Sequence, residues 1–220
     1  DGRYYLYYAM AGKTFTSPIH VAVSDNPAGP FSYYGEVHNP DGSTYNRHIT
    51  FDPGVLNDNG KIYLYYGWAL GVPKEKLHGM AAAMGGTQSE AFQEKMIQVQ
   101  EMLFGKSRRE IAEEKDGLMG ANVVQLAEDM LTVISEPRRI VPGQFDAMGT
   151  EYEDHAFFEA SSIRKIGVFY YFIYSSQVSH ELCYAVSKYP DREFHYGGVI
   201  ISNGDIGYQG RTETDRLAMT

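Results

Sequence analysis

The chain has one cysteine and one tryptophan among its 220 residues. Cys183 therefore forms no disulfide within the chain, and its strand-like surroundings predict a small, buried, hydrophobic side chain. No uninterrupted apolar run approaches the roughly 20 residues that a membrane-spanning helix needs. Basic residues are also few, with 19 Lys and Arg against 28 Asp and Glu, for a formal net charge of −9. This negative charge argues against nucleic acid or an anionic membrane as the main partner.

Aromatic residues and glycine are abundant instead, with 18 Tyr, 11 Phe and 23 Gly. This mixture favours twisted strands joined by tight turns, and a hydrophobic fraction of 43% is ample for a sizeable core. Most of the tyrosines are expected to fill that core. Aromatic faces also stack on sugar rings, so a neutral, hydroxyl-rich partner suits both the charge and the composition.

A glycine turn followed by an aromatic-rich strand occurs three times, at residues 1–9, 59–67 and 166–175. The second and third copies are each preceded by a further predicted strand, at 49–56 and 157–166. The strands that follow the copies are predicted at 19–24, 31–37, 122–127, 138–141, 182–187 and 194–201. Four strands per unit is the organisation of a propeller blade, so the sequence predicts an all-β repeat fold whose first unit lacks its first strand.

Residues 72–121 interrupt this pattern, because no tyrosine occurs between Tyr66 and Tyr152. Two stretches, 87–90 and 107–110, have the Ser/Thr-x-x-Glu spacing of a capping box. A helical face is predicted at Phe92, Met96, Val99 and Leu103, ending near Gly105, and a shorter helix is predicted from about Arg108 to Asp116, ending at Gly117. The sequence predicts a helical hairpin inserted in the second unit and leaves open whether it only decorates its blade or shapes substrate access.

Two isolated carboxylates stand at equivalent points of the predicted first strands. Glu159 follows Phe158 in a mostly apolar run, where burial is expected to raise its pKa and make it a proton donor near neutral pH. Asp52 follows Phe51 in a similar run, so the repeat geometry is expected to aim both carboxylates at one place. Trp68 is expected on the same rim as a platform for sugar stacking, although a lone tryptophan at a strand end more often belongs to a core.

Together these segments resemble glycoside hydrolase family 43. The resemblance rests on Phe51-Asp52-Pro53, on the run from Asn57 to Gly67, and on the run from Phe157 to Lys165. It implies a five-bladed β-propeller that hydrolyses arabinose- and xylose-containing glycans with inversion, so that an acid protonates the leaving oxygen while a carboxylate activates water. By the matching motif, Glu159 is expected to be the general acid and Asp52 the carboxylate that raises its pKa and orients it. Trp68, Phe51 and Phe158 are the predicted substrate-binding residues.

The resemblance implies an organisation with about blades 1 to 3 present. Residues 1–71 are expected to form blade 1 without its first strand and the start of blade 2, and residues 72–121 a helical insertion. Residues 122–220 are expected to form the rest of blade 2, blade 3 and the start of a loop to blade 4. The family's general base lies on the first strand of the first blade, so it is expected upstream of residue 1, and the chain resembles an interior fragment.

The resemblance implies no required cofactor, with calcium as an option in the channel of the complete propeller, and an oligo- or polysaccharide substrate as partner. Two alternatives stay open: a non-catalytic carbohydrate-binding propeller, and a retaining five-bladed hydrolase of fructosides, which the separation of the carboxylates would distinguish. The sequence decides neither the cellular location nor the choice between arabinoside and xyloside.

Other candidate residues favour structural roles. His48, His155 and His180 lie near the predicted active face, but no pair has a metal-ligand spacing, so no metal site is predicted and surface or core positions are expected. The acidic cluster of Glu151, Glu153 and Asp154 could bind calcium or sugar hydroxyls, but a solvated loop is favoured.

Overall fold

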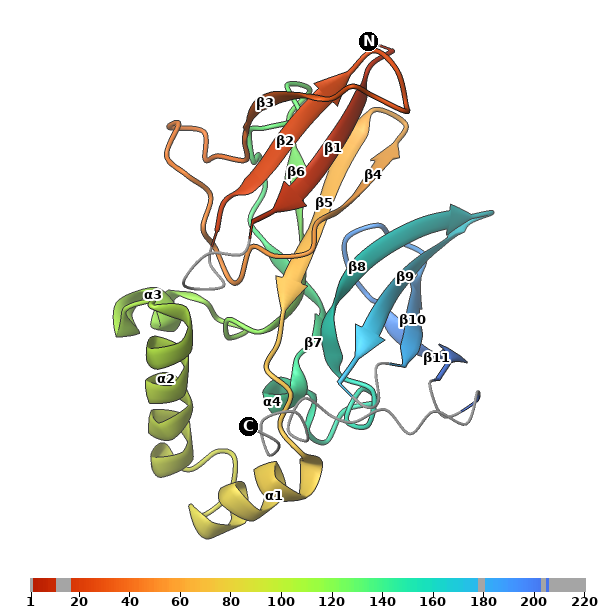
Figure 1. The fold of residues 1–220 in the computed structure, drawn as a ribbon. Coiled ribbons are helices and arrows are strands. Elements are labelled where there is room, and N and C mark those ends of the chain that lie inside the picture. Colours follow the sequence, from red (N-terminus) through yellow and green to blue (C-terminus); the bar gives the residue numbers. More distant parts are fainter. Residues whose placement is uncertain (1, 11–16, 178–180, 203–204, 206–220) are drawn as a thin grey trace, which may run out of the picture.

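The computed structural model describes residues 2–10, 17–177, 181–202 and 205, which form three antiparallel sheets and a group of helices (Figure 1). The first sheet has the order β1(Tyr4–Ala9), β2(Ile19–Ser24), β3(Ser32–Glu36). The second has the order β4(Gly54–Asp58), β5(Lys61–Trp68), β6(Gly120–Leu126), β7(Arg138–Pro142). The third has the order β8(Phe157–Ile166), β9(Phe169–Ser176), β10(Leu182–Ser187), β11(His195–Ile201). Within each sheet, strands adjacent in sequence therefore pair with each other, as the sequence repeat predicts.

Tight turns fix the pairing of the strands. Asn59 and Gly60 join β4 to β5 with φ values of 54° and 87°, a conformation that Asn-Gly pairs adopt readily in two-residue hairpins. The side chain of Asn57 accepts a hydrogen bond from the backbone of Gly60 at 2.9 Å. The predicted first strand from Ile49 is shorter than expected, because the chain reaches strand geometry only at Gly54.

Strand β5 lies between the other two sheets, and its alternate residues face opposite sides. Tyr63 and Tyr65 pack with buried residues of β8, β9 and β10, while Ile62, Leu64 and Tyr66 pack with β2. This is the period of two that a strand imposes on its side chains. The buried tyrosines keep partners for their hydroxyls: Tyr65 donates to the carbonyl of Pro190 at 2.6 Å. The tyrosine-rich core expected from composition is confirmed.

Three helices lie between β5 and β6: α1(Lys74–Ala83), α2(Glu90–Phe104) and α3(Arg108–Glu113), together called the helical segment below. They extend away from the sheets at one end of β5 (Figure 1). A short fourth helix, α4(Gln144–Ala147), follows β7. In the described ranges, no helix has both the length and the apolar character needed to cross a membrane.

The helical segment corrects several details of the sequence prediction. Ser107 and Glu110 form the predicted capping box, but the cap of α2 is Ser89, which accepts from the backbone of Phe92, so the box predicted at Thr87 is wrong. Helix α2 ends at Gly105 as predicted, with φ 63°. Its buried line contains Gln100 and Phe104 beside Phe92 and Met96, instead of Val99 and Leu103. Helix α3 ends at Glu113, and α1 was not predicted.

Candidate active site

Three backbone segments meet where β5 ends. The backbone amide of Gly67 donates to the carbonyl of Phe51 at 2.9 Å, and that of Ala69 donates to the carbonyl of Phe158 at 2.9 Å. The loop before β4 and the beginning of β8 are thus hydrogen-bonded to the same end of β5. This arrangement places the two segments that contain Asp52 and Glu159 side by side.

The Asp52 carboxylate completes this junction directly. Its Oδ2 accepts a hydrogen bond from the backbone amide of Ala160 at 3.1 Å, and Ala160 is the residue after Glu159. Burial raises the pKa of Asp52, and the hydrogen bond from Ala160 opposes that rise. The structure therefore brings the Asp52 carboxylate to the backbone next to Glu159, whereas the prediction that both carboxylates are aimed at one place stays a prediction.

Backbone strain is concentrated at this junction. Asp52 has φ 43° and Ala160 has φ 66°, in the left-handed region that residues with a side chain rarely adopt. The ladder between β8 and β9 is irregular on both sides of Glu159, which is opposite Ser175 and half-buried. Such irregularities turn a side chain away from its regular direction and are common next to active sites. Strain of this kind marks the junction as a candidate functional site.

Gly54 allows β4 and β8, the first strands of the second and third sheets, to approach each other. A Cβ at this position would lie 2.4 Å from the backbone oxygen of Ser161 in β8, so no larger residue fits without a shift of one strand. The close approach of β4 and β8 keeps Asp52, two residues before Gly54, beside the Glu159 segment.

Three predicted substrate-binding aromatics, Trp68, Phe51 and Phe158, lie in one cluster that also contains Phe104 of α2. The ring centroids of Trp68 and Phe158 are 5.9 Å apart, and those of Trp68 and Phe104 are 6.0 Å apart. Trp68 and Phe158 are each only 8% exposed, whereas Phe51 is half-buried. Because sugar stacking needs an exposed face, Phe51 is the best placed of the three to touch a substrate in this arrangement.

A network of charged side chains holds the loop that contains His48 and Asp52. Glu114, directly after α3, has a side chain only 3% exposed and accepts from Arg47 Nε at 2.8 Å and Nη2 at 2.9 Å. It also accepts from the backbone amide of His48 at 3.0 Å. Burial, together with the charges of Arg139, Arg47 and Lys106, lowers the pKa of His48 to about 2, so the ring is neutral. Sequence reasoning missed Glu114, because a lone glutamate at a helix end carries no signal of its distant partner.

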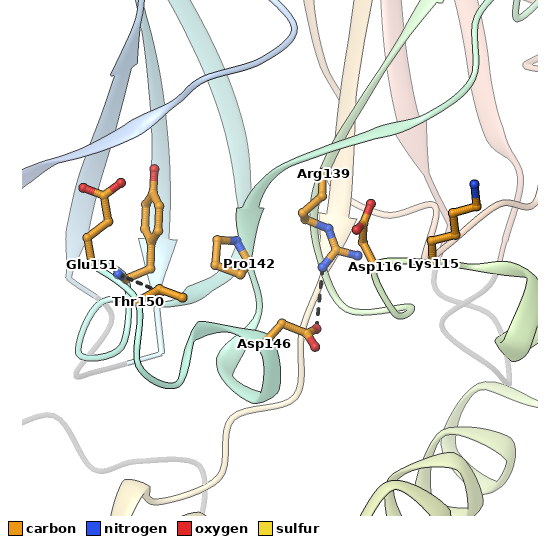
Figure 2. A pocket seen from close by; sticks show the side chains of 8 residues that line it. Lys115, Asp116, Arg139, Pro142, Asp146, Thr150 and Glu151 are labelled. Atoms are coloured by element: carbon orange, nitrogen blue, oxygen red, sulfur yellow. Dashed lines mark hydrogen bonds and ion pairs between the residues drawn. The ribbon is translucent and has the colours of Figure 1, made fainter. Parts of the chain in front are cut away.

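A cavity of about 670 Å³ lies away from this junction, between the loop after α3 and the region around α4 (Figure 2). Its walls include Lys115, Asp116, Arg139, Asp146 and Glu151. Arg139 points into this space from β7, donates to Asn122 Oδ1 at 2.8 Å and to the carbonyl of Gly117 at 2.9 Å, and lies 3.8 Å from Asp146. Neither Asp52 nor Glu159 lines this cavity, so its size does not make it the candidate active site.

The acidic cluster predicted for a loop is largely paired. Lys74 of α1 lies 3.2 Å from Glu153 and 2.5 Å from Asp154, and Glu151 lies 3.0 Å from His195. These contacts connect α1 and β11 to the loop before β8. The pairing favours a structural role over calcium binding.

One group of metal-ligating side chains comes together within the described ranges: His155, Glu181 and Cys183. His155 Nδ1 lies 2.9 Å from Glu181 Oε2, and the ring of Tyr196 stacks on His155 at 4.7 Å. Burial raises the pKa of Cys183 to about 11, which disfavours the thiolate that binds metals. An imidazole and a thiol also do not suit calcium, which prefers oxygen ligands, so this group does not fit the calcium option. His180 lies outside the described residues.

Comparisons with known proteins agree with the motifs. The sequence model of the family described as glycosyl hydrolases family 43 matches residues 1–114. The chain is 41% identical over 210 residues to a protein of Thermoclostridium stercorarium described as a xylosidase/arabinosidase, which covers 94% of this chain and 35% of that protein. A xylosidase/arabinosidase of Bacteroides ovatus is 30% identical over 205 residues, which is 92% of this chain and 54% of that protein.

Solved structures show the same likeness. A family 43 β-xylosidase/α-arabinofuranosidase from a compost metagenome, solved with xylotriose in a calcium-free form, has 28% identity and a TM-score of 0.58. A family 43 enzyme from Xanthomonas citri has 25% identity and a TM-score of 0.59. Each comparison covers 92% of this chain and 54% of the solved chain. The chain thus spans between about a third and about half of the length of these relatives.

Proposed function

This chain belongs to glycosyl hydrolases family 43. From that premise we propose that it is part of a glycosidase, which removes terminal α-L-arabinofuranosyl or β-D-xylosyl residues from plant-type glycans with inversion of configuration. Relatives described as xylosidases/arabinosidases, at 30% and 41% identity, support this substrate class. The bound xylotriose in the compost metagenome structure supports an oligosaccharide as partner.

The proposed architecture is a five-bladed β-propeller in which the three sheets are blades 1 to 3. The first sheet is blade 1, β4 to β7 are blade 2, and β8 to β11 are blade 3. The helical segment, within residues 72–121, is then an insertion between the second and third strands of blade 2. The sequential strand order within each sheet supports this assignment.

In the proposed mechanism Glu159 is the general acid, which protonates the oxygen of the leaving group as the glycosidic bond breaks. Asp52 orients the Glu159 segment and, through its negative charge, favours the protonated form of Glu159. The observation that carries this proposal is the 3.1 Å hydrogen bond from Ala160 to Asp52, which ties Asp52 to the residue next to Glu159. Inversion also needs a carboxylate that activates water, and we assign none of this chain's carboxylates to that step.

The aromatic cluster completes the proposed site. Phe51 would contact the sugar, while Trp68 and Phe158 form the layer behind it. No cofactor takes part in this mechanism. Calcium remains an option for the channel of the complete propeller.

The test is hydrolysis of aryl α-L-arabinofuranoside and aryl β-D-xyloside by the full-length gene product, followed by proton NMR during the first minutes. The proposal predicts turnover of at least one substrate and a first-formed sugar of opposite anomeric configuration. Glu159→Gln should lose most of the activity on substrates with poor leaving groups. The matched control is Glu193→Gln, because Glu193 is exposed and far along the chain from the junction. Binding of xylotriose without turnover would favour a carbohydrate-binding propeller, and retention of configuration would overturn the inverting mechanism.

A further inference from the structure

The helical segment and the residues that follow it contact the aromatic cluster beside Glu159 and the loop that leads to Asp52. Phe104, the last residue of α2, is 1% exposed and lies in the cluster that includes Trp68 and Phe158. Helix α3 contributes Ile111 to the same cluster, and Glu114 follows α3. A decoration on the side of a blade would not need to reach these residues.

The first connection leads from α2 to Glu159. The rings of Phe104 and Trp68 form a T-shaped pair with an interplanar angle of 80°, and Trp68 in turn contacts Phe158. Phe158 is held a second time through its carbonyl, which accepts from Ala69, the residue after Trp68. Because Phe158 directly precedes Glu159, the packing of Phe104 against Trp68 limits where Glu159 can lie.

The second connection leads from the end of α3 to Asp52. The Glu114 carboxylate holds the Arg47 guanidinium with two hydrogen bonds and the backbone of His48 with a third. Lys106, between α2 and α3, donates to the carbonyl of Asn46. His48 has φ 54°, a strained conformation that persists only where its surroundings hold it. Asp52 follows four residues later in the same loop.

We propose that Phe104 and Glu114 are positioning residues, through which the helical segment holds Glu159 and Asp52 in productive geometry. This proposal rests on the roles proposed above for those two carboxylates. A misplacement of about 1 Å at a reacting group can cost about a hundredfold in rate, so small relaxations of this cluster are sufficient. In this proposal the helical segment affects the reaction rate by positioning Glu159 and Asp52, and it does not itself contact the substrate.

The test compares variants of the full-length gene product on a glycoside with a poor leaving group and on an activated aryl glycoside. Phe104→Ala is expected to lower kcat on the poor substrate by about ten- to a hundredfold and much less on the activated one, with KM changed less than about threefold. Phe104→Leu should recover most of the loss, because it refills the space beside Trp68. Met102→Ala, in the same helix but 76% exposed, is the matched control and should behave as wild type.

Glu114 is tested in the same way. Glu114→Ala removes the hydrogen bonds that Glu114 accepts from Arg47 and from the His48 amide, and it should lower kcat on the poor substrate. Glu114→Gln keeps an acceptor for the His48 amide and should recover part of that activity. Glu113→Gln is the control, because Glu113 is exposed and, among the described residues, its ion pair is with Arg109 of the same helix.

Equal losses of kcat on the two substrates, or losses that follow only the thermal unfolding temperature, would overturn the positioning role. Glu159→Ala separates this proposal from the proposed function. If Glu159→Ala spares the activated substrate while Phe104→Ala affects neither, the positioning role fails and the acid role stands. If Glu159→Ala affects both substrates equally, the acid role itself fails, and the positioning proposal fails with it.

Discussion

His48 makes the free energy of unfolding depend on pH in a way that can be worked out. The folded protein holds the ring neutral, since its pKa is lowered to about 2, whereas an unfolded histidine titrates near 6.5. Glu114 lies 3.4 Å from the ring but its charge is taken up by Arg47, and three cations oppose protonation. Below pH 6.5 the unfolded chain therefore binds one more proton than the folded chain at this position, so stability falls as pH falls.

The magnitude follows from proton linkage. Between pH 7.5 and pH 5.5, one group with these two pKa values lowers the free energy of unfolding by about 1.4 kcal/mol. The loss approaches about 1.4 kcal/mol for each further pH unit, until the folded ring begins to take up its own proton. The substitution His48→Asn removes this titration, and asparagine tolerates the φ of 54° at this position.

Urea unfolding of wild type and His48→Asn at pH 7.5, 6.5 and 5.5 measures the effect. The difference between the two proteins isolates His48 from all other titrating groups, and it should change by about 1.4 kcal/mol across that range. Parallel pH dependence of wild type and His48→Asn would refute the neutral, buried state of this ring.

Two further predictions concern the junction itself. Gly54→Ala should lower the free energy of unfolding, measured by urea titration, by about 1–3 kcal/mol, because the new Cβ meets the backbone oxygen of Ser161. Gly71→Ala is the control and should change the free energy of unfolding little, because open space surrounds Gly71. Equal effects of the two substitutions would contradict the close approach of β4 and β8. Asp52→Asn keeps an acceptor for the Ala160 amide but removes the charge, so it should lower the upper pKa of the pH profile of kcat/KM; an unchanged upper limb would contradict the modulating role of Asp52.

The sheets could be predicted because their signals are local. Each glycine turn precedes an alternating, aromatic-rich strand, and the turn at Asn59 and Gly60 has the geometry expected for that pair. The equivalent positions of Asp52 and Glu159 in two repeats predicted that both carboxylates are aimed at one place, and the structure shows that the Asp52 carboxylate reaches the backbone next to Glu159. In both cases residues at the same position of two repeats are expected at equivalent places in the fold, so a local sequence pattern predicts a three-dimensional position.

The remaining features depend on contacts between distant residues. Helix α1 begins after Pro73 without a side-chain cap, so no start signal identified it. The hydrogen bonds of Glu114 with Arg47 join residues 67 positions apart. Trp68 is covered in part by Phe104, the last residue of α2, whose ring packs against it. No window of the sequence contains both members of these pairs.

The general-acid role of Glu159 is the central claim, and the dependence of rate on the leaving group tests it most directly. The measurement is kcat/KM of wild type and Glu159→Ala for a series of aryl glycosides whose leaving phenols span a range of pKa. The account predicts that the variant loses most activity on poor leaving groups and far less on activated ones, because only the former need a proton. A uniform loss across the series would contradict the acid role of Glu159.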